Sequence, residues 1–488
     1  MRLITILIFI SSSLFAQKNI DKKLLTDYDK FRETTITHRR FKHADIEPLI
    51  LKLKNDPQFK VATMGQSIEG RNIYLISIGS GATDVLLWSQ MHGDEPTATM
   101  ALMDLFNFFG QKNNFKKFKQ TLKKELTLHF IPMLNPDGAE KYQRRNALGV
   151  DLNRDALRLQ NPESRILKKV RDSLEAEWGF NLHDQSRYYA AGRNAKTASI
   201  SFLAPAYNFE KNINKVRGNA MKLIAGMNDV LQKHLPEKIA RYNDSFEPRA
   251  FGDNITKWGT STILIESGGL KNDREKQYLR KLHFVALLSA FQSIATRGYE
   301  KRKISEYESI PFNRYNAFHD LILRKANIEL NEHKFVVDIS FRRSEVEYDQ
   351  NSKFFFQSYI TDIGDLSTSY AYEEFDASAY QTEPAKIYPK KLANKSDLRR
   401  LDLLKLLSEG YTHFIMQDAP DKKEIPHSPF SFSENQFPNF IDIQQGKNPS
   451  LLLLNNGRIE KILANGFLFD LSQQQSEIMM AVNSWLNE

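Results

Sequence analysis

A histidine and a glutamate lie three positions apart in SQMHGDEPTATM (89–100), directly after the apolar run DVLLW (84–88). His92 and Glu95 could supply two metal ligands from a single turn, because zinc accepts imidazole nitrogen and carboxylate oxygen. A catalytic zinc site takes a third protein ligand and leaves one position for water. His183 in GFNLHDQ is a candidate, since it also follows an apolar run. Taken alone, the pair is more commonly an ordinary exposed turn, and a lone histidine at a strand end is usually structural.

A carboxylate ends another apolar run, STILIESGG (261–269), at Glu266. Burying a carboxylate is costly unless it is paired or faces a cleft. Partial burial would raise its pKa and suit Glu266 to take a proton from water; a structural ion pair is the alternative. Asp184, beside the candidate histidine, is a candidate to support it. His129 lies inside a strand-like run, and we expect it to pack in the core.

A basic, amide-rich loop follows a third apolar run, in NPDGAEKYQRRNALGVDLNRD (135–155). Arginine recognises carboxylates through paired hydrogen bonds. Beside a metal, this loop would bind the anionic end of a substrate. A surface loop with scattered charge is the alternative for this stretch considered alone.

The elements that must position these residues alternate between apolar strands and helices. Strands are expected at 83–90, 125–134, 179–184 and 261–267, and helices at 96–110, 163–178 and 272–298. This order predicts an α/β fold with a mixed, mainly parallel central sheet flanked by helices. In such sheets functional groups collect where strands end, and the polar residues of interest all follow apolar strands.

Beyond about residue 304 short strands dominate, as in KFVVDISFRR (334–343) and KFFFQSYITDIG (353–364). Asn456-Gly457 and Asn465-Gly466 are each typical of a hairpin turn. One capped helix is expected in SDLRRLDLLKLLSEG (396–410). We therefore expect a catalytic domain at 17–303 and a mostly β accessory domain at 304–488. The accessory domain shows no convergent set of histidine and acidic residues, and its role is open.

Composition excludes several function classes. The 488 residues contain no cysteine, so disulfides, thiolate ligands and a cysteine nucleophile are ruled out. The net charge of +9 comes without the interleaved basic and aromatic residues typical of nucleic-acid binding. Residues 1–16 combine Arg2 with a short apolar run and predict a signal peptide, hence a secreted or periplasmic protein. No stretch resembles a transmembrane span.

Together these motifs resemble one known family, the zinc metallocarboxypeptidases of the carboxypeptidase A type. The resemblance covers about residues 60–295. It is carried, in the family's order, by EGRNIYLISIG, His92-x-x-Glu95, NPDG, RRNALGVDLNR, His183 and TILIESGG. It implies a carboxypeptidase-like fold and one zinc ion per chain, held by His92, Glu95 and His183. It also implies peptide hydrolysis by metal-activated water, with Glu266 as general base.

The resemblance implies substrate contacts as well. Arg144 matches the arginine that polarises the scissile carbonyl, with Arg145 as the other possible match. Asn153 and Arg154 match the pair that holds the terminal carboxylate of the substrate. Arg71 matches an accessory substrate contact.

The chain departs from the family pattern near these positions. Asp155 stands where many relatives have asparagine and could alter the charge near Arg154. The mobile tyrosine of the family has no clear match, and Tyr242 is a candidate. Asp253 could face the substrate side chain and favour a basic group, or cap a turn instead.

The expected substrate is a peptide with a free C-terminal carboxylate, and a murein peptide of the cell envelope is the alternative. An inactive binding protein on the same scaffold is a third possibility. It is the weakest of the three, because all three ligands and the base are present. The sequence leaves side-chain specificity and oligomeric state open.

Overall fold

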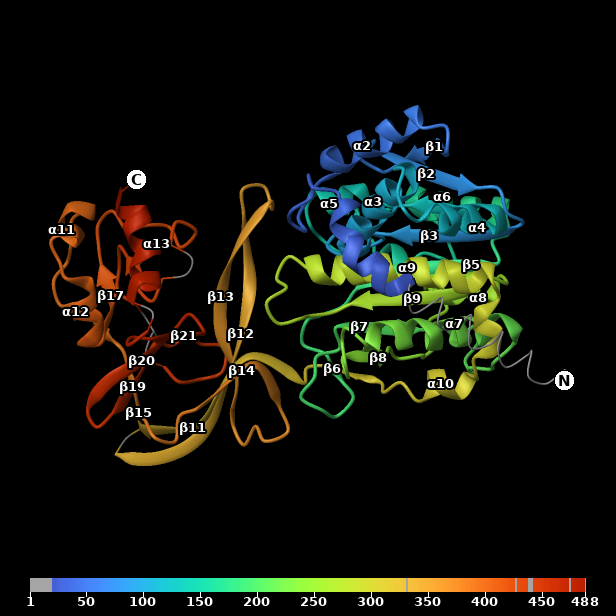
Figure 1. Ribbon diagram of the computed structural model, residues 1–488. Helices are drawn as coiled ribbons and strands as arrows, with labels where there is room; N and C mark the ends of the chain where they lie inside the picture. Colours follow the sequence, from blue (N-terminus) through green and yellow to red (C-terminus); the bar gives the residue numbers. More distant parts are fainter. Residues whose placement is uncertain (1–19, 331, 426–427, 438–441, 474, 488) are drawn as a thin grey trace. The chain divides into compact units, whose positions relative to one another are not determined.

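The computed structural model describes residues 20–330, 332–425, 428–437, 442–473 and 475–487 (Figure 1). Contacts divide the chain into two compact units, Met1–Tyr315 and Asn316–Glu488. The division lies after Tyr315 rather than at the expected 303/304, because α10 (Ile304–Glu308) packs against α7 (Lys215–Gln232). The predicted signal peptide, residues 1–16, lies outside the described residues and stays a prediction.

The first unit is built on an eight-stranded sheet. The strands at its centre, β4, β3, β5 and β9, are parallel, and the pairs β1–β2, β2–β4 and β7–β9 are antiparallel. The predicted mixed, mainly parallel sheet is thus confirmed. In spatial order the strands are β1 (Phe59–Gln66), β2 (Asn72–Gly79), β4 (Leu126–Ile131), β3 (Thr83–Ser89), β5 (Trp178–Asp184), β9 (Ser261–Ser267), β7 (Ile200–Leu203) and β8 (Ile239–Arg241).

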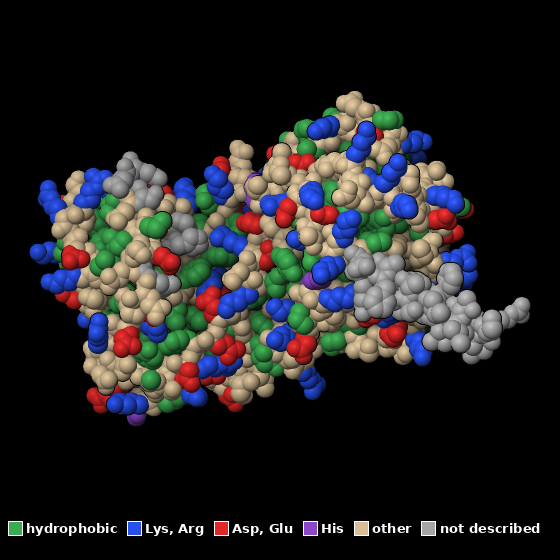
Figure 2. Space-filling view, viewed as in Figure 1, with side chains coloured by type: hydrophobic (Ala, Val, Ile, Leu, Met, Phe, Trp, Pro, Cys, Tyr) green, Lys and Arg blue, Asp and Glu red, His purple; other side chains and the backbone are tan. Residues whose placement is uncertain are grey.

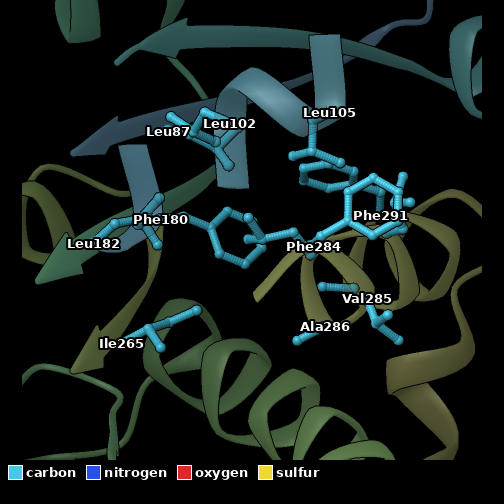
Figure 3. Close-up of a cluster of buried hydrophobic side chains, with 14 of the residues drawn as sticks. Leu87, Leu102, Leu105, Phe180, Leu182, Ile265, Phe284, Val285, Ala286 and Phe291 are labelled. Atoms are coloured by element: carbon cyan, nitrogen blue, oxygen red, sulfur yellow. The ribbon is translucent and has the colours of Figure 1, made fainter. Parts of the chain in front are cut away.

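Helices cover both faces of this sheet, which explains why its central strands are apolar on both sides. On one face, Leu87 and Phe180 pack against α3 and α9 through Leu102 and Phe284 (Figure 3). On the other face, Trp88 belongs to a second core with α6 and α8. The α-helices of this unit not yet given are α2 (His43–Lys52), α3 (Thr97–Gly110), α4 (Lys116–Glu125), α5 (Pro136–Glu140), α6 (Pro162–Leu174), α8 (Phe251–Lys257) and α9 (Gln277–Ala295).

Short elements complete the first unit. The strands β6 (Ala190–Ala191) and β10 (Asn313–Arg314) pair with each other in a separate two-stranded ladder. The 3-10 helices are η1 (Tyr28–Lys30), η2 (Leu53–Asn55), η3 (Leu152–Arg154) and η4 (Gly298–Lys301).

The second unit is dominated by a sheet in which β11 pairs antiparallel with β12 and parallel with β14. Asn456-Gly457 and Asn465-Gly466 have positive φ at both residues and join β19 to β20 and β20 to β21. Both predicted hairpin turns are therefore confirmed. The strands are β11 (Phe318–Leu330), β12 (His333–Tyr348), β13 (Lys353–Gly364), β14 (Tyr370–Asp376), β15 (Gln381–Pro384), β19 (Leu451–Asn455), β20 (Arg458–Ala464) and β21 (Phe467–Asp470).

A small parallel sheet with helices is inserted between β15 and β19. Its strands are β16 (Lys386–Ile387), β17 (Tyr411–Ile415) and β18 (Ser431–Ser433). The single helix expected at 396–410 is wrong: the structure has α11 (Lys395–Arg399) and α12 (Leu403–Ser408), because the Asp402 side chain accepts from the Lys405 backbone and starts a new helix. The C-terminal helix α13 (Gln475–Asn487) joins the same small core.

Basic and acidic side chains are interspersed on the visible surface of both units (Figure 2). The net positive charge is therefore spread over this face and forms no single basic field on it. Among the helices of the described residues, none is long and apolar enough to cross a membrane.

Candidate metal centre

The candidate ligands come from the ends of parallel strands that lie next to each other. His92 and Glu95 lie in the turn between β3 and α3, and His183 lies near the end of β5. Glu266 is directly opposite His183 on the neighbouring β9. Residues far apart in sequence, such as Glu95 and His183 at 88 positions, thus share one edge of the sheet, as expected for the carboxyl ends of parallel strands.

The side chains of His92, Glu95 and His183 converge on one point. Nδ1 of His92 lies 2.8 Å from Oε1 of Glu95, and Nδ1 of His183 lies 2.7 Å from Oε2 of the same carboxylate. The two Nδ1 atoms are 3.2 Å apart. Ligand atoms around a tetrahedral zinc ion at its usual bond lengths lie about 3.3 Å from each other. The two nitrogens and the carboxylate therefore fit zinc in donor type, and they lie somewhat closer together than ligands around a bound ion.

Asp151 supports this cluster and was not singled out from the sequence. Its Oδ1 lies 3.0 Å from Nε2 of His92 and also accepts from the backbone N–H of Asn153. A carboxylate on the outer nitrogen of a ligating histidine fixes the ring and its tautomer, leaving Nδ1 for the metal. The available signal was its position in GVDLNR, beside the two residues expected to hold the substrate.

The electrostatics of the cluster follow from how many partners each group has. Burial favours the neutral form of Glu95, but the charges and hydrogen bonds of the two imidazoles hold its pKa well below the ordinary value. Burial by itself favours the neutral form of both imidazoles and so acts to lower the pKa of each. His183, which faces one carboxylate, ends with a lowered pKa, whereas two carboxylates raise the pKa of His92 to about 9. Metal binding would release the proton from His92.

Glu266 is buried, as the three ligands are, but its carboxylate lacks the hydrogen bonds to imidazole that Glu95 makes. Its Oε2 has no hydrogen-bond partner among the described residues. Burial and then the negative charge of Glu95 raise its pKa well above the ordinary value. A carboxyl group in this state can take up a proton from a water molecule beside it and pass it on.

Of the two candidate arginines, the structure brings Arg144 to the cluster. Its Nη1 lies 3.0 Å from Nδ1 of His92 and 3.2 Å from Oε1 of Glu95, and its Nε donates to Asp151. Arg145 is exposed and donates to the carbonyl of Gly149, so it does not serve as the alternative. The side chain of Arg144 is 42% exposed, so it is accessible to solvent beside the buried ligands.

Asn153 and Arg154 lie together on η3. Asn153 is buried, and its Oδ1 accepts from the Phe251 backbone at the start of α8. Arg154 is partly exposed and pairs with Glu247 at 3.4 Å. Asp155 does not modify the charge of Arg154 through a direct contact: it accepts from the backbones of residues 160 and 161 and caps its own loop.

Two other predicted substrate contacts have structural partners. Arg71 pairs with the fully buried Asp137 at 2.7 Å and so ties the turn before β2 to the NPDG turn. Asp253 accepts from the backbone of Glu247, which is the turn-capping alternative for this residue; burial raises its pKa to about 7. The structure thus gives no contact that assigns Asp253 to a substrate pocket.

Of two further histidine and acidic residues considered from the sequence, Asp184 differs from expectation and His129 agrees with it. The side chain of Asp184 accepts from Thr97 and Lys276, so it supports the starts of helices α3 and α9 rather than an imidazole. Its backbone N–H points at Oε2 of Glu95, at 3.2 Å. His129 is buried and lies 2.8 Å from Asp84, in agreement with a packed structural histidine.

Comparison with known proteins agrees with this geometry. Residues 47–186 match a family model described as zinc carboxypeptidase. Carboxypeptidase SOL1 of Arabidopsis thaliana is 29% identical over 181 residues, covering 30% of this chain and 36% of that protein. The carboxypeptidase N catalytic chain of Homo sapiens is 27% identical over 143 residues, covering 25% and 31%. The chain therefore spans about a third of the length of these curated relatives.

Among solved structures, a metallo-carboxypeptidase from Burkholderia cenocepacia is similar, with 16% identity and a TM-score of 0.43. The match covers 53% of this chain and 70% of that chain.

Proposed function

We propose that this chain is a zinc-dependent carboxypeptidase, a proposal supported by the match of residues 47–186 to the zinc carboxypeptidase family model. In the proposed reaction it hydrolyses the amide bond before a C-terminal residue. The observation that carries the proposal is the convergence of His92, Glu95 and His183, with Glu266 opposite His183 on the next strand.

The proposed roles follow from the contacts. A zinc ion bound by the three ligands would supply Lewis acidity that activates water and polarises a carbonyl group. Glu266 would take the proton of the attacking water and deliver it to the leaving amine. Arg144, partly exposed beside the ligands, would donate to the oxygen of the scissile carbonyl.

The substrate carboxylate would be held by η3. Arg154 is partly exposed and forms an ion pair with Glu247, and its guanidinium can form a second ion pair with a carboxylate. The position of Asn153 beside it is fixed by the start of α8. This arrangement favours substrates with a free C-terminus over substrates in which the C-terminus is an amide.

The test uses the full chain with zinc and an N-acylated dipeptide, with release of the C-terminal amino acid as the readout. We expect turnover that a chelator abolishes, and loss of turnover when the substrate carboxylate is replaced by an amide. Glu266→Gln should lower kcat by about 10²–10⁴-fold with the zinc content unchanged. His183→Ala should lower the zinc content itself, whereas His129→Gln, away from the cluster, should leave it unchanged.

The outcomes separate the remaining possibilities. Turnover of a murein tripeptide but of no ordinary peptide would assign a cell-envelope substrate. A stable wild-type protein that takes up no zinc and hydrolyses neither substrate would overturn the proposal and favour a binding protein on this scaffold.

A further inference from the structure

The last segment of the first unit, Pro311–Tyr315, is fastened to the loop that follows β5. Its strand β10 pairs antiparallel with β6, and the backbone of Gly192 donates to the carbonyl of Phe312. This segment lies beyond the part of the chain that matches the carboxypeptidase family model. It is nevertheless part of the unit that contains the candidate metal centre.

The side-chain amide of Asn313 connects this segment to Gln185, which in turn contacts β9. Nδ2 of Asn313 donates to Oε1 of Gln185 at 2.9 Å. Gln185 follows His183 by two positions, and its backbone donates to the carbonyl of Ser267, the neighbour of Glu266. The position of the segment is therefore fixed relative to a ligand and to the proposed base.

Three tyrosines form a row that starts at this segment. The row ends near β9, because the Tyr242 backbone donates to Phe202, which pairs with Ile265 beside Glu266. The rings of Tyr315 and Tyr189 lie 5.1 Å apart, and those of Tyr189 and Tyr242 lie 5.9 Å apart, both at tilted angles. The hydroxyls of Tyr189 and Tyr242 are 3.3 Å apart. Burial, together with the nearby negative charge of Glu266, raises the pKa of both hydroxyls. Tyr315 is 63% exposed and forms the outer end of the row.

We propose that Tyr315, Tyr189 and Tyr242 form an aromatic wall of the substrate site, which binds a ring-bearing side chain on the acyl side of the scissile bond. The substrate class is thus a peptide with an aromatic residue before the C-terminal one, and Tyr315 is the specificity-determining member. This inference rests on the proposed carboxypeptidase function.

The exposure of the tyrosine row places it on the acyl side of the scissile bond. The residue to be released must lie near the carboxylate-binding pair, where Asn153 is buried. The rest of the peptide has to extend from the scissile bond to solvent. The tyrosine row runs from partly buried rings near Glu266 to the exposed ring of Tyr315, so it offers such a path. Aromatic rings along this path can stack on a substrate ring.

The test compares two N-acylated dipeptides that share the C-terminal residue and carry either phenylalanine or alanine before it. For the full-length wild type we expect kcat/KM to be about threefold to tenfold higher for the phenylalanine substrate. Tyr315→Ala should abolish this preference, because the ring that would contact the phenylalanine side chain is removed. Tyr315→Phe should keep the preference.

Phe312→Ala is the matched control. Phe312 is also exposed and lies in the same segment, but its ring packs under the guanidinium of Arg241 rather than on the tyrosines. The preference should survive in this variant. A wild type that hydrolyses both substrates equally, or a Tyr315→Ala variant that retains the preference, would contradict the proposal of an aromatic wall.

A binding measurement separates the wall from the proposed reaction. The two peptides are titrated into full-length Glu266→Gln protein, which should bind them without turning them over. Tighter binding of the phenylalanine peptide, lost when Tyr315→Ala is added, would support the aromatic wall. This holds even if the wild type hydrolyses neither peptide, a result that would contradict only the proposed carboxypeptidase function. Equal binding of both peptides would contradict the wall alone.

Discussion

Nε2 of His92 lies 3.0 Å from Oδ1 of Asp151, on the opposite side of the ring from the nitrogen that faces Glu95. The two residues are 59 positions apart in sequence. Through this contact the loop that carries the arginines also determines how a metal ligand is oriented.

Replacing Asp151 with asparagine should weaken zinc binding by about 10- to 100-fold, because the ligand loses the carboxylate that orients it. Competition with a chelator of known affinity measures the change. Asp155→Asn is the control, since Asp155 caps its own loop. Unchanged zinc affinity in Asp151→Asn would show that the contact does not support the metal.

Tyr142, two positions before Arg144, should hold the loop of the site against the N-terminal segment. Tyr142 has a φ of 47°, its ring lies 3.8 Å from the guanidinium carbon of Arg40, and its hydroxyl accepts from Arg39. We expect Tyr142→Ala to lower kcat/KM by about 10- to 100-fold through displacement of Arg144, with the zinc content unchanged. Tyr142→Phe keeps the ring and should stay within about threefold of the wild type. Equal loss in both variants would contradict this role for the ring.

A buried ion pair should contribute strongly to the stability of the first unit. Arg280 and Asp104 are fully buried and bridge α9 to α3, and Arg280 also donates to the carbonyls of Glu33 and Ile36. Arg280→Met removes the positively charged partner of the buried Asp104 carboxylate and should lower the free energy of unfolding by about 3–5 kcal/mol. Lys30→Ala, which removes an exposed pair, should cost less than about 1 kcal/mol.

Urea unfolding followed by tryptophan fluorescence suits this measurement, because Trp88, Trp178 and Trp258 lie in the first unit and Trp485 in the second. A loss below about 1 kcal/mol in Arg280→Met would show that the Tyr28 hydroxyl and the Glu33 backbone N–H, which also donate to Asp104, already stabilise the carboxylate.

The second unit should be less stable in mild acid. Burial lowers the pKa of His319 and of His413 to about 4. Between pH 6.5 and 4 these residues bind fewer protons when folded than when unfolded, so the free energy of unfolding falls as the pH drops through this range. The loss is up to about 3 kcal/mol for each histidine.

Oxidation of Met416, which is fully buried in the second unit, reports its unfolding in urea at pH 7 and pH 4.5. His319→Gln should reduce the difference between the two pH values, whereas His333→Gln, on the exposed part of β12, should not. A second unit equally stable at both pH values would contradict the assignment.

The convergence of the ligands could be predicted because it depends on strand order alone. Apolar runs followed by His92, His183 and Glu266 imply parallel strands whose carboxyl ends share an edge. Asp151 was missed because its role depends on a loop that folds back over His92. Tyr315 was missed because β10 has two residues and no periodicity, and because the expected boundary separated it from the site.

Local interactions explain the remaining differences. The apolar spacing at 396–410 fits one helix, yet Asp402 offers a competing cap in its middle. The sequence allows Asp253 to be either a specificity residue or a turn cap, and the hydrogen bond that it accepts from the Glu247 backbone favours the cap. Sequence shows that a short polar side chain can cap a helix or turn, but only coordinates show which backbone N–H it meets.

The pairing of β15 with β19 affects synthesis of the chain. Segment 385–450 must leave the ribosome before β19 can cover β15, so the nascent sheet has an open edge for that interval. Unpaired edges recruit strands from other chains, and short edge strands that carry charge or proline resist this. With four residues that include Glu383 and Pro384, β15 is short and carries both charge and proline while this edge is unpaired.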